Sequence, residues 1–182
     1  MTSFDFLVQT ELEHFENSLD VALSADVELV NDIARYMAEL KGKRLRPVLA
    51  LLSAKAVQVE CRDNIIDAAV AVEMIHAATM VHDDVVDSAK MRRGSASINE
   101  KWSGQVAVLM GDFLLAKALN ILVEIGDLRA LSVVSKATQR LSVGEIFEIQ
   151  IGEQHDVRES SYFSMVNDKT ASLISASVCL GP

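Results

Sequence analysis

Cysteine and proline are both scarce in this sequence, and each scarcity excludes a class of protein. The two cysteines, Cys61 and Cys179, lie far apart and match no spacing typical of a metal or redox site. We therefore expect buried free thiols in a reducing compartment, and hence a cytoplasmic protein. Only two of the 182 residues are proline, and Ala, Leu, Met, Glu and Lys are plentiful, which favours an all-α chain.

The sequence also lacks an excess of positive charge and a long apolar run. Its formal net charge is −9, which argues against a broad basic surface for nucleic acid. The longest uncharged run, residues 170–182, has thirteen residues, whereas a membrane-spanning helix needs about 20. The N-terminal residues are acidic and amphipathic, unlike a secretory signal. We expect neither nucleic-acid binding nor a membrane span.

No internal repeat, low-complexity tract or linker divides the chain, so we expect one helical domain over residues 1–182. Apolar residues recur at spacings of three and four along most of the sequence, which predicts helices. The expected helices cover residues 4–20, 26–40, 46–58, 63–88, 104–125, 127–157 (with a break) and 160–180. The most irregular segment, 88–104, is expected to be a functional loop or a solvated turn.

A polar stripe runs along the apolar helix expected at 63–88. At about 100° per residue, one sector of this helix carries Glu73, His76, Met80, Asp83 and Asp87. Buried charges need compensation, so the stripe should face a pocket, a partner or a metal. His82 projects to the opposite side, and we expect it to make a structural hydrogen bond.

The acidic end of this helix is followed directly by bases. Asp83 and Asp87 are one turn apart, close enough for both carboxylates to reach one cation. Oxygen ligands suit Mg²⁺, which completes its shell with water and substrate phosphates, and Arg92 and Arg93 offer planar forks for phosphate oxygens. A diphosphate–Mg²⁺ group would explain both sets of charges. Surface salt bridges between the helix end and the loop are the alternative.

A second group of bases precedes another expected helix. Seven of the seventeen Lys and Arg residues lie in two short pieces, 41–46 and 90–93, which suits a local anion site in an acidic protein. Lys43 and Arg46 can share one face at a helix start, where Pro47 suits the first turn and free N–H groups favour anions. They are either a diphosphate cradle or surface bases whose stems cover apolar residues.

Several pieces, in order along the chain, resemble one known family. They are GKRLRP at 42–47, EMIHAATMVHDDVVD at 73–87 with MRRG at 91–94, VLMGDFLLAKA at 108–118, GEIFEIQ at 144–150 and KTASL at 169–173. Together they resemble the trans-isoprenyl diphosphate synthases, the polyprenyl synthetase family. The resemblance implies an isoprenoid-synthase-type helical bundle around a central apolar cavity. It also implies that an allylic diphosphate condenses with isopentenyl diphosphate.

The resemblance also implies roles for individual residues. Mg²⁺ would be held by Asp83 and Asp87, with Asp84 in support. The allylic diphosphate would be bound by Arg92 and Lys169, and isopentenyl diphosphate by Lys43, Arg46, His76 and Arg93. Lys169 and Thr170 match the family's catalytic Lys-Thr pair, although their local sequence alone is that of ordinary helix residues. Glu148 stands where relatives commonly carry Gln or Asp, which suggests a polar contact.

Product length and assembly are expected from the same comparison. Ala78 and Thr79 occupy positions where short-chain relatives often carry aromatic residues, so a medium- or long-chain polyprenyl product is expected. Thr79 lies one turn below Asp83 and can face the pocket, whereas the role of Ala78 rests on resemblance alone. The apolar helix 104–125 is expected to form a homodimer interface.

One family motif is missing. The second aspartate-rich motif follows the Lys-Thr pair in relatives, and this chain stops before it. We therefore expect an N-terminal portion of a polyprenyl synthetase domain, truncated at the C-terminus and inactive in condensation by itself. Two alternatives stay open: a non-catalytic subunit that regulates an intact synthase, and a helical interaction protein without these ligands.

Overall fold

The computed structural model describes residues 5–40, 42–57 and 63–181, so Lys41 and Cys61 lie outside the described residues. The prediction of an all-α chain is confirmed. After a 3₁₀ turn, Asp5–Val8, the order is α1 Gln9–Leu23, α2 Glu28–Glu39, α3 Leu45–Ala56, α4 Asp63–Val86, β1 Met91–Arg92, β2 Ser95–Ala96, α5 Ile98–Lys101, α6 Gly104–Ile125, α7 Leu128–Glu153, α8 Glu159–Val166, a π-helical turn Asn167–Ala171, and α9 Ser172–Cys179.

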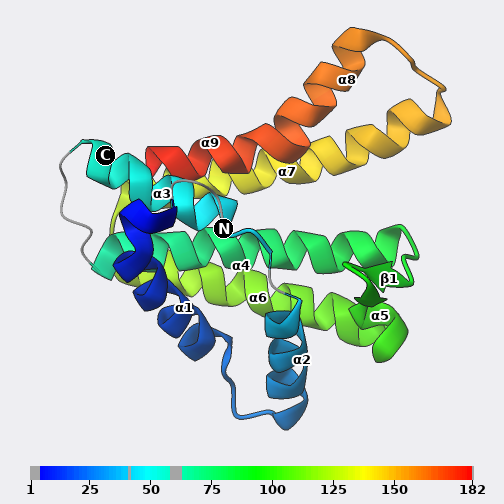
Figure 1. The fold of residues 1–182 in the computed structure, drawn as a ribbon. Coiled ribbons are helices and arrows are strands. Elements are labelled where there is room, and N and C mark those ends of the chain that lie inside the picture. The colour runs from blue at the N-terminus through cyan, green and yellow to red at the C-terminus, as the bar shows by residue number, and fades with distance from the viewer. Residues whose placement is uncertain (1–4, 41, 58–62, 182) are drawn as a thin grey trace.

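Helix α4 is the centre of the fold because it is apolar on almost every side. It packs most extensively on α6 and also contacts α1, α3 and α9, as Figure 1 shows. Val70, Val72, Met74 and Ile75 are almost fully buried along it. Burial of each such side chain contributes about 1.5–3 kcal/mol, so the helix that carries the polar stripe is rigidly held.

A glycine allows α6 to approach α4 closely. A Cβ added at Gly111 would lie 2.2 Å from Nε2 of His82, so only glycine leaves room for that ring. Nε2 of His82 lies 3.2 Å from the carbonyl oxygen of Val108. The predicted structural hydrogen bond of His82 is therefore confirmed.

The helix expected at 127–157 is not broken, which corrects that prediction. Helix α7 is continuous from Leu128 to Glu153, and the chain turns back only at 154–158. Helix α8, the π-helical turn and α9 then return along α7, and Figure 1 shows α8 with the end of α7 extending beyond the other helices. The helix expected at 160–180 is thus interrupted by a π-helical turn.

The irregular segment 88–104 contains structure that the sequence did not predict. Strands β1 and β2 form an antiparallel hairpin in which Met91 pairs with Ala96 and Arg92 with Ser95. Its two loop residues, Arg93 and Gly94, have φ values of 52° and 83°. Two positive φ values match the twist of the strands on either side. Helix α5 follows the hairpin directly.

Two helices, 64–86 and Gly104–Ile125, are long and apolar enough to cross a membrane by length and composition alone. In the first, 61% of the apolar window is buried within the fold, and in the second 33%. Core helices of globular proteins pass the same test, so this is weak support for a span. The expectation of no membrane span stays a prediction.

Candidate functional site

A cavity of about 550 Å³ lies where the start of α3, the middle of α4 and the β-hairpin meet. We call it the cradle. It is lined by Gly42, Lys43, Arg44, Leu45, Arg46, Glu73, His76 and Arg93. The four side chains that the resemblance assigned to isopentenyl diphosphate, Lys43, Arg46, His76 and Arg93, are therefore brought together from three separate parts of the chain.

Two arginines at the edge of the cradle differ in how they are compensated. The guanidinium of Arg44 donates to Glu16 at 2.8 Å and to Glu73 at 2.9 Å, so it ties α3 to α1 and α4. Burial acts to lower the pKa of Arg44, but these hydrogen bonds outweigh it and raise the pKa. Arg44, absent from the sequence-predicted site, is a structural residue.

Arg46 is the opposite case. Its Nε is buried and has no hydrogen-bond partner among the described residues. Burial lowers the pKa of Arg46, and the nearby carboxylate of Glu73 opposes that shift only in part. A buried donor without a partner is unfavourable unless a ligand completes it, so Arg46 indicates an anion in the cradle.

His76 faces the cradle as a neutral ring. Burial, followed by the positive charges of Arg46 and Arg93, lowers the pKa of His76 from 6.5 to about 3. At pH 7 the imidazole is therefore uncharged, and it can donate one N–H to an anion without adding a charge.

Arg93 reaches the cradle from the hairpin loop. Its Nη1 donates to the carbonyl oxygen of Leu40, the residue that follows α2. A Cβ added at Gly42 would lie 2.8 Å from the same nitrogen, so Gly42 leaves room for this guanidinium. The left-handed conformation at Arg93 carries strain that is typical of functional sites.

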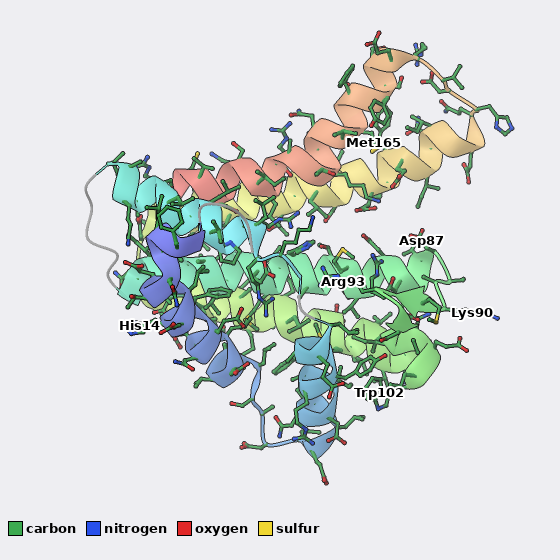
Figure 2. The ribbon with its side chains drawn as sticks, in the orientation of Figure 1. His14, Asp87, Lys90, Arg93, Trp102 and Met165 are labelled. Atoms are coloured by element: carbon green, nitrogen blue, oxygen red, sulfur yellow. The ribbon has the colours of Figure 1, made fainter. Side chains whose placement is uncertain are left out.

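Asp83 and Asp87 lie at the end of α4, and neither carboxylate forms a hydrogen bond or ion pair with a described residue. Figure 2 shows Asp87 at the end of α4 next to the hairpin, on the side that faces α7. Burial, and then the negative charge of Glu145 on α7, raises the pKa of Asp83 from 3.8 to about 6. The ionised pair is therefore incompletely compensated in this structure.

Asp84 has a different role from its two neighbours. Its side chain is buried, and its Oδ1 accepts from Nε of Arg92 at 2.9 Å. This pair fixes the hairpin on α4. Among the described residues no group of three or more acidic, His or Cys side chains is arranged to hold a metal. Asp83 and Asp87 are therefore a candidate donor set of two carboxylates at the end of α4.

Lys169 approaches this donor set from the π-helical turn. Its Nζ lies 2.7 Å from Oε2 of Glu145 and also pairs with Glu148. Burial acts to lower the pKa of Lys169, but the two carboxylates outweigh it and raise the pKa. The three groups carry a net charge of −1 and form a lysine clamp, a name we keep for Glu145, Glu148 and Lys169.

Gly144 positions this clamp. A Cβ at Gly144 would lie 2.5 Å from the backbone nitrogen of Lys169, so only glycine allows the π-helical turn to press on α7. π-Helical turns inside α-helices are frequent at functional sites. The sequence motif GEIFEIQ contained Gly144 and Glu145, but the contact with Lys169 depends on the turn and carries no local signal.

Three other residues that the sequence predicted for the site do not line the cradle. Thr170 follows Lys169 and is exposed. Ala78 is buried, and Thr79 is half-buried with its hydroxyl donating to the carbonyl oxygen of His76 at 2.9 Å. Neither Ala78 nor Thr79 lines the cradle. Their roles in chain length stay predictions.

A family model described as polyprenyl synthetase matches residues 27–182. The chain belongs to the polyprenyl synthetase family. Among curated members, the octaprenyl diphosphate synthase of Escherichia coli (strain K12) is 38% identical over 160 residues, which are 87% of this chain and 49% of that protein. The heptaprenyl diphosphate synthase component 2 of Geobacillus stearothermophilus is 37% identical over 171 residues, or 94% of this chain and 53% of that protein.

Solved structures of family members share the fold. The polyprenyl synthase from Caulobacter crescentus CB15, solved with calcium and isoprenyl diphosphate, superposes with a TM-score of 0.94 at 30% identity, covering 98% of this chain and 54% of that one. A decaprenyl diphosphate synthase from Rhodobacter capsulatus gives a TM-score of 0.94 at 28% identity, covering 98% and 55%. The chain spans about half the length of the relatives it matches.

A divalent cation fits the donor set at the end of α4. Mg²⁺ commonly binds one or two carboxylates and takes its other ligands from water and phosphate oxygens. Asp83 and Asp87 supply two oxygen donors that form no hydrogen bond or ion pair with a described residue, and His76 of the cradle lies on the same helix, α4. The residues present therefore suit a metal–diphosphate group better than a metal held by protein alone.

Proposed function

We propose that this chain forms the diphosphate-binding half of a trans-polyprenyl diphosphate synthase, a prenyltransferase that condenses an allylic diphosphate with isopentenyl diphosphate. The unpartnered Nε of Arg46 in a cavity of bases is the observation that carries this proposal. Such a group is unfavourable in the empty fold and becomes favourable when a diphosphate accepts from it.

The proposed roles follow from the contacts. Isopentenyl diphosphate is bound by Lys43, Arg46, His76 and Arg93 in the cradle. Asp83 and Asp87 would hold Mg²⁺, which supplies positive charge to the departing allylic diphosphate. Lys169 donates its remaining ammonium proton to the allylic diphosphate, and Thr170 follows Lys169 in the chain. The apolar residues of α4 keep water away from the reacting carbons.

The roles proposed for Arg92 and Asp84 depend on the ion pair that joins their side chains. Their mutual ion pair makes them positioning residues first. Asp84 accepts from Nε and Nη2 of Arg92 and so fixes the guanidinium plane, and the other N–H groups of Arg92 remain for an allylic diphosphate. We therefore propose that Asp84 acts through Arg92 rather than as a metal ligand.

Chain length and assembly are part of the same proposal. The small side chains of Ala78 and Thr79 support a medium- or long-chain product. Exposed apolar residues on α6 and α7 support a homodimer formed by these helices: Val108, Leu109, Leu119, Val123, Val143, Ile146 and Ile149. The proposed location is the cytoplasm. Cys179 is a free thiol as expected, but it is exposed, so the expectation that it is buried was wrong.

Calorimetry with an allylic diphosphate, with and without Mg²⁺, tests the proposal. Asp83→Ala and Asp87→Ala should each abolish the magnesium-dependent part of the affinity, because each removes an oxygen ligand. Arg46→Ala should weaken isopentenyl diphosphate instead. Unchanged magnesium dependence in both aspartate variants would refute the metal assignment.

A non-catalytic subunit that regulates an intact synthase is the second candidate. Turnover by the purified chain alone supports the enzyme. An effect only on the product of an added intact synthase supports the subunit. A chain that binds no diphosphate in the presence of Mg²⁺ is neither, and would be a helical interaction protein.

A further inference from the structure

A second cavity adjoins the cradle on the side of α4 that faces α1 and α2. Its volume is about 110 Å³, and its apolar wall includes Leu19, Leu23, Met37, Met74, Ala77 and Met80. It shares five lining residues with the cradle, namely Gly42, Arg44, Glu73, His76 and Arg93. The cradle therefore continues into an apolar recess, which we call the side recess.

Four of the charged groups that line the side recess form two ion pairs, and Asp20 and Arg93 line it as well. Arg44 donates to Glu73 at 2.9 Å, and Nε of Arg92 donates to Asp84 at 2.9 Å. Paired charges have little to gain from water, so the recess suits an apolar group better than a polar one. Three methionines among the lining residues can adapt their shape to it.

Its size sets the length of the apolar group. An apolar cavity of about 150 Å³ in another protein stays dry and binds benzene, which has six carbons. A volume of about 110 Å³ therefore suits a group of four or five carbons, the size of one isoprene unit.

The recess does not lead to the donor set at the end of α4. Asp83 is close to Glu145 and Lys169, which belong to α7 and the π-helical turn. The recess instead lies against α1 and α2, and neither Asp83 nor Lys169 lines it. A group bound in it would therefore touch neither Asp83 nor Lys169, although Asp84 and its partner Arg92 do line the recess.

We propose that the side recess binds the five-carbon unit of isopentenyl diphosphate while the diphosphate lies in the cradle. This inference rests on the proposed function of the cradle. The bound molecule is then held in a non-productive orientation, because its reactive double bond lies away from Asp83 and Lys169. This non-productive binding needs no metal, and it competes with the productive orientation of the same substrate.

Calorimetry in EDTA tests the proposal with two ligands, inorganic diphosphate and isopentenyl diphosphate. The wild-type chain should bind isopentenyl diphosphate at least about 10-fold more tightly, because burial of five carbons adds to the affinity of the shared head group. Equal affinities would overturn the side recess and leave the cradle standing. Failure of inorganic diphosphate to bind would overturn both.

Two variants fill the recess from opposite walls. Ala77→Leu on α4 and Ala38→Leu on α2 should each reduce the preference for isopentenyl diphosphate to about 2-fold or less, with little change for inorganic diphosphate. Two positions keep the test decisive if one variant unfolds, which circular dichroism would reveal. Ala116→Leu, on the exposed side of α6, is the matched control and should keep the full preference.

A preference that survives both filled variants would show that the five-carbon unit lies elsewhere, and would overturn the proposal.

Discussion

Arg44 and Arg46 are two residues apart, yet replacing each by methionine should change stability in opposite directions. Methionine keeps an unbranched stem of similar length and removes only the charged head. In Arg46→Met the buried Nε without a partner disappears. In Arg44→Met the carboxylates of Glu16 and Glu73 lose the donor that compensates them.

The magnitudes follow from the burial of each group. A buried unsatisfied donor costs about 1–3 kcal/mol, and part of that cost is offset by the nearby charge of Glu73, so Arg46→Met should gain about 1 kcal/mol. Glu73 is only 8% exposed, and breaking a buried ion pair costs about 3–5 kcal/mol. For a chain of this size, the melting temperature should rise by about 2–4 °C in Arg46→Met and fall by about 6 °C or more in Arg44→Met.

Thermal unfolding followed by circular dichroism, at pH 7 without Mg²⁺ or diphosphate, measures both effects. The same two proteins are then titrated with inorganic diphosphate. Arg46→Met should lose about 10- to 100-fold in affinity, because a hydrogen bond to a charged group is worth about 1.5–3 kcal/mol. A less stable Arg46→Met would refute the reasoning, since it would mean that the fold already compensates this guanidinium.

Three further predictions concern the end of α4 and the lysine clamp. Asp83→Asn should stabilise the metal-free chain at pH 7 by about 1 kcal/mol after allowance for solvent screening, because the pKa of Asp83 is raised from 3.8 to about 6. Because the pKa of Asp83 is raised in the folded state, the ionised carboxylate destabilises the fold, and the neutral Asn does not. The stability advantage of Asp83→Asn over wild type should therefore be full above pH 6, shrink as the pH falls through 6 and vanish below 3.8. An advantage that does not change with pH would contradict this reasoning. Glu148→Gln keeps an acceptor for Lys169 but removes one negative charge from the clamp, so calorimetry should show several-fold tighter magnesium-dependent binding of an allylic diphosphate, whereas weaker binding would mean that Glu148 is needed to position Lys169. Gly144→Ala should lower the melting temperature by about 2–12 °C through overpacking against Lys169, while Gly152→Ala on the same helix, with open space around it, should not lower it; equal effects would show that the close approach is unimportant.

The fold was predictable where a single helix carries its own signal. The apolar spacing of α4 and α6 predicted both helices to within two residues of their ends. The break expected within residues 127–157 was wrong, because Gly144 lies inside α7, where it makes room for the π-helical turn, and does not end the helix. The hairpin β1–β2 was missed because its loop begins with Arg93, a residue uncommon at positive φ.

Part of the candidate site was likewise predictable from the sequence, and part was not. The helical spacing of Asp83 and Asp87 predicted that they share a face, and both remain without a protein partner, as a metal site requires. The pair between Asp84 and Arg92 was not predictable, since it depends on where the hairpin folds back onto α4. For the same reason the sequence could not separate Arg44 from Arg46. Both belong to one basic run, and only the positions of Glu16 and Glu73 decide which is compensated.

Two residues that line the cradle have a strained backbone, and a third, Arg46, lacks a hydrogen-bond partner for its buried Nε. Arg44 and Arg93 both have left-handed backbones, with φ values of 50° and 52°. Arg44 is held in that conformation by two glutamates, and Arg93 by the carbonyl oxygen of Leu40. A diphosphate that drew Arg93 from Leu40 would remove one of these restraints. Arg46 has no such restraint to lose, so it should contribute more to the affinity for diphosphate than Arg93 does, although both bear the same charge.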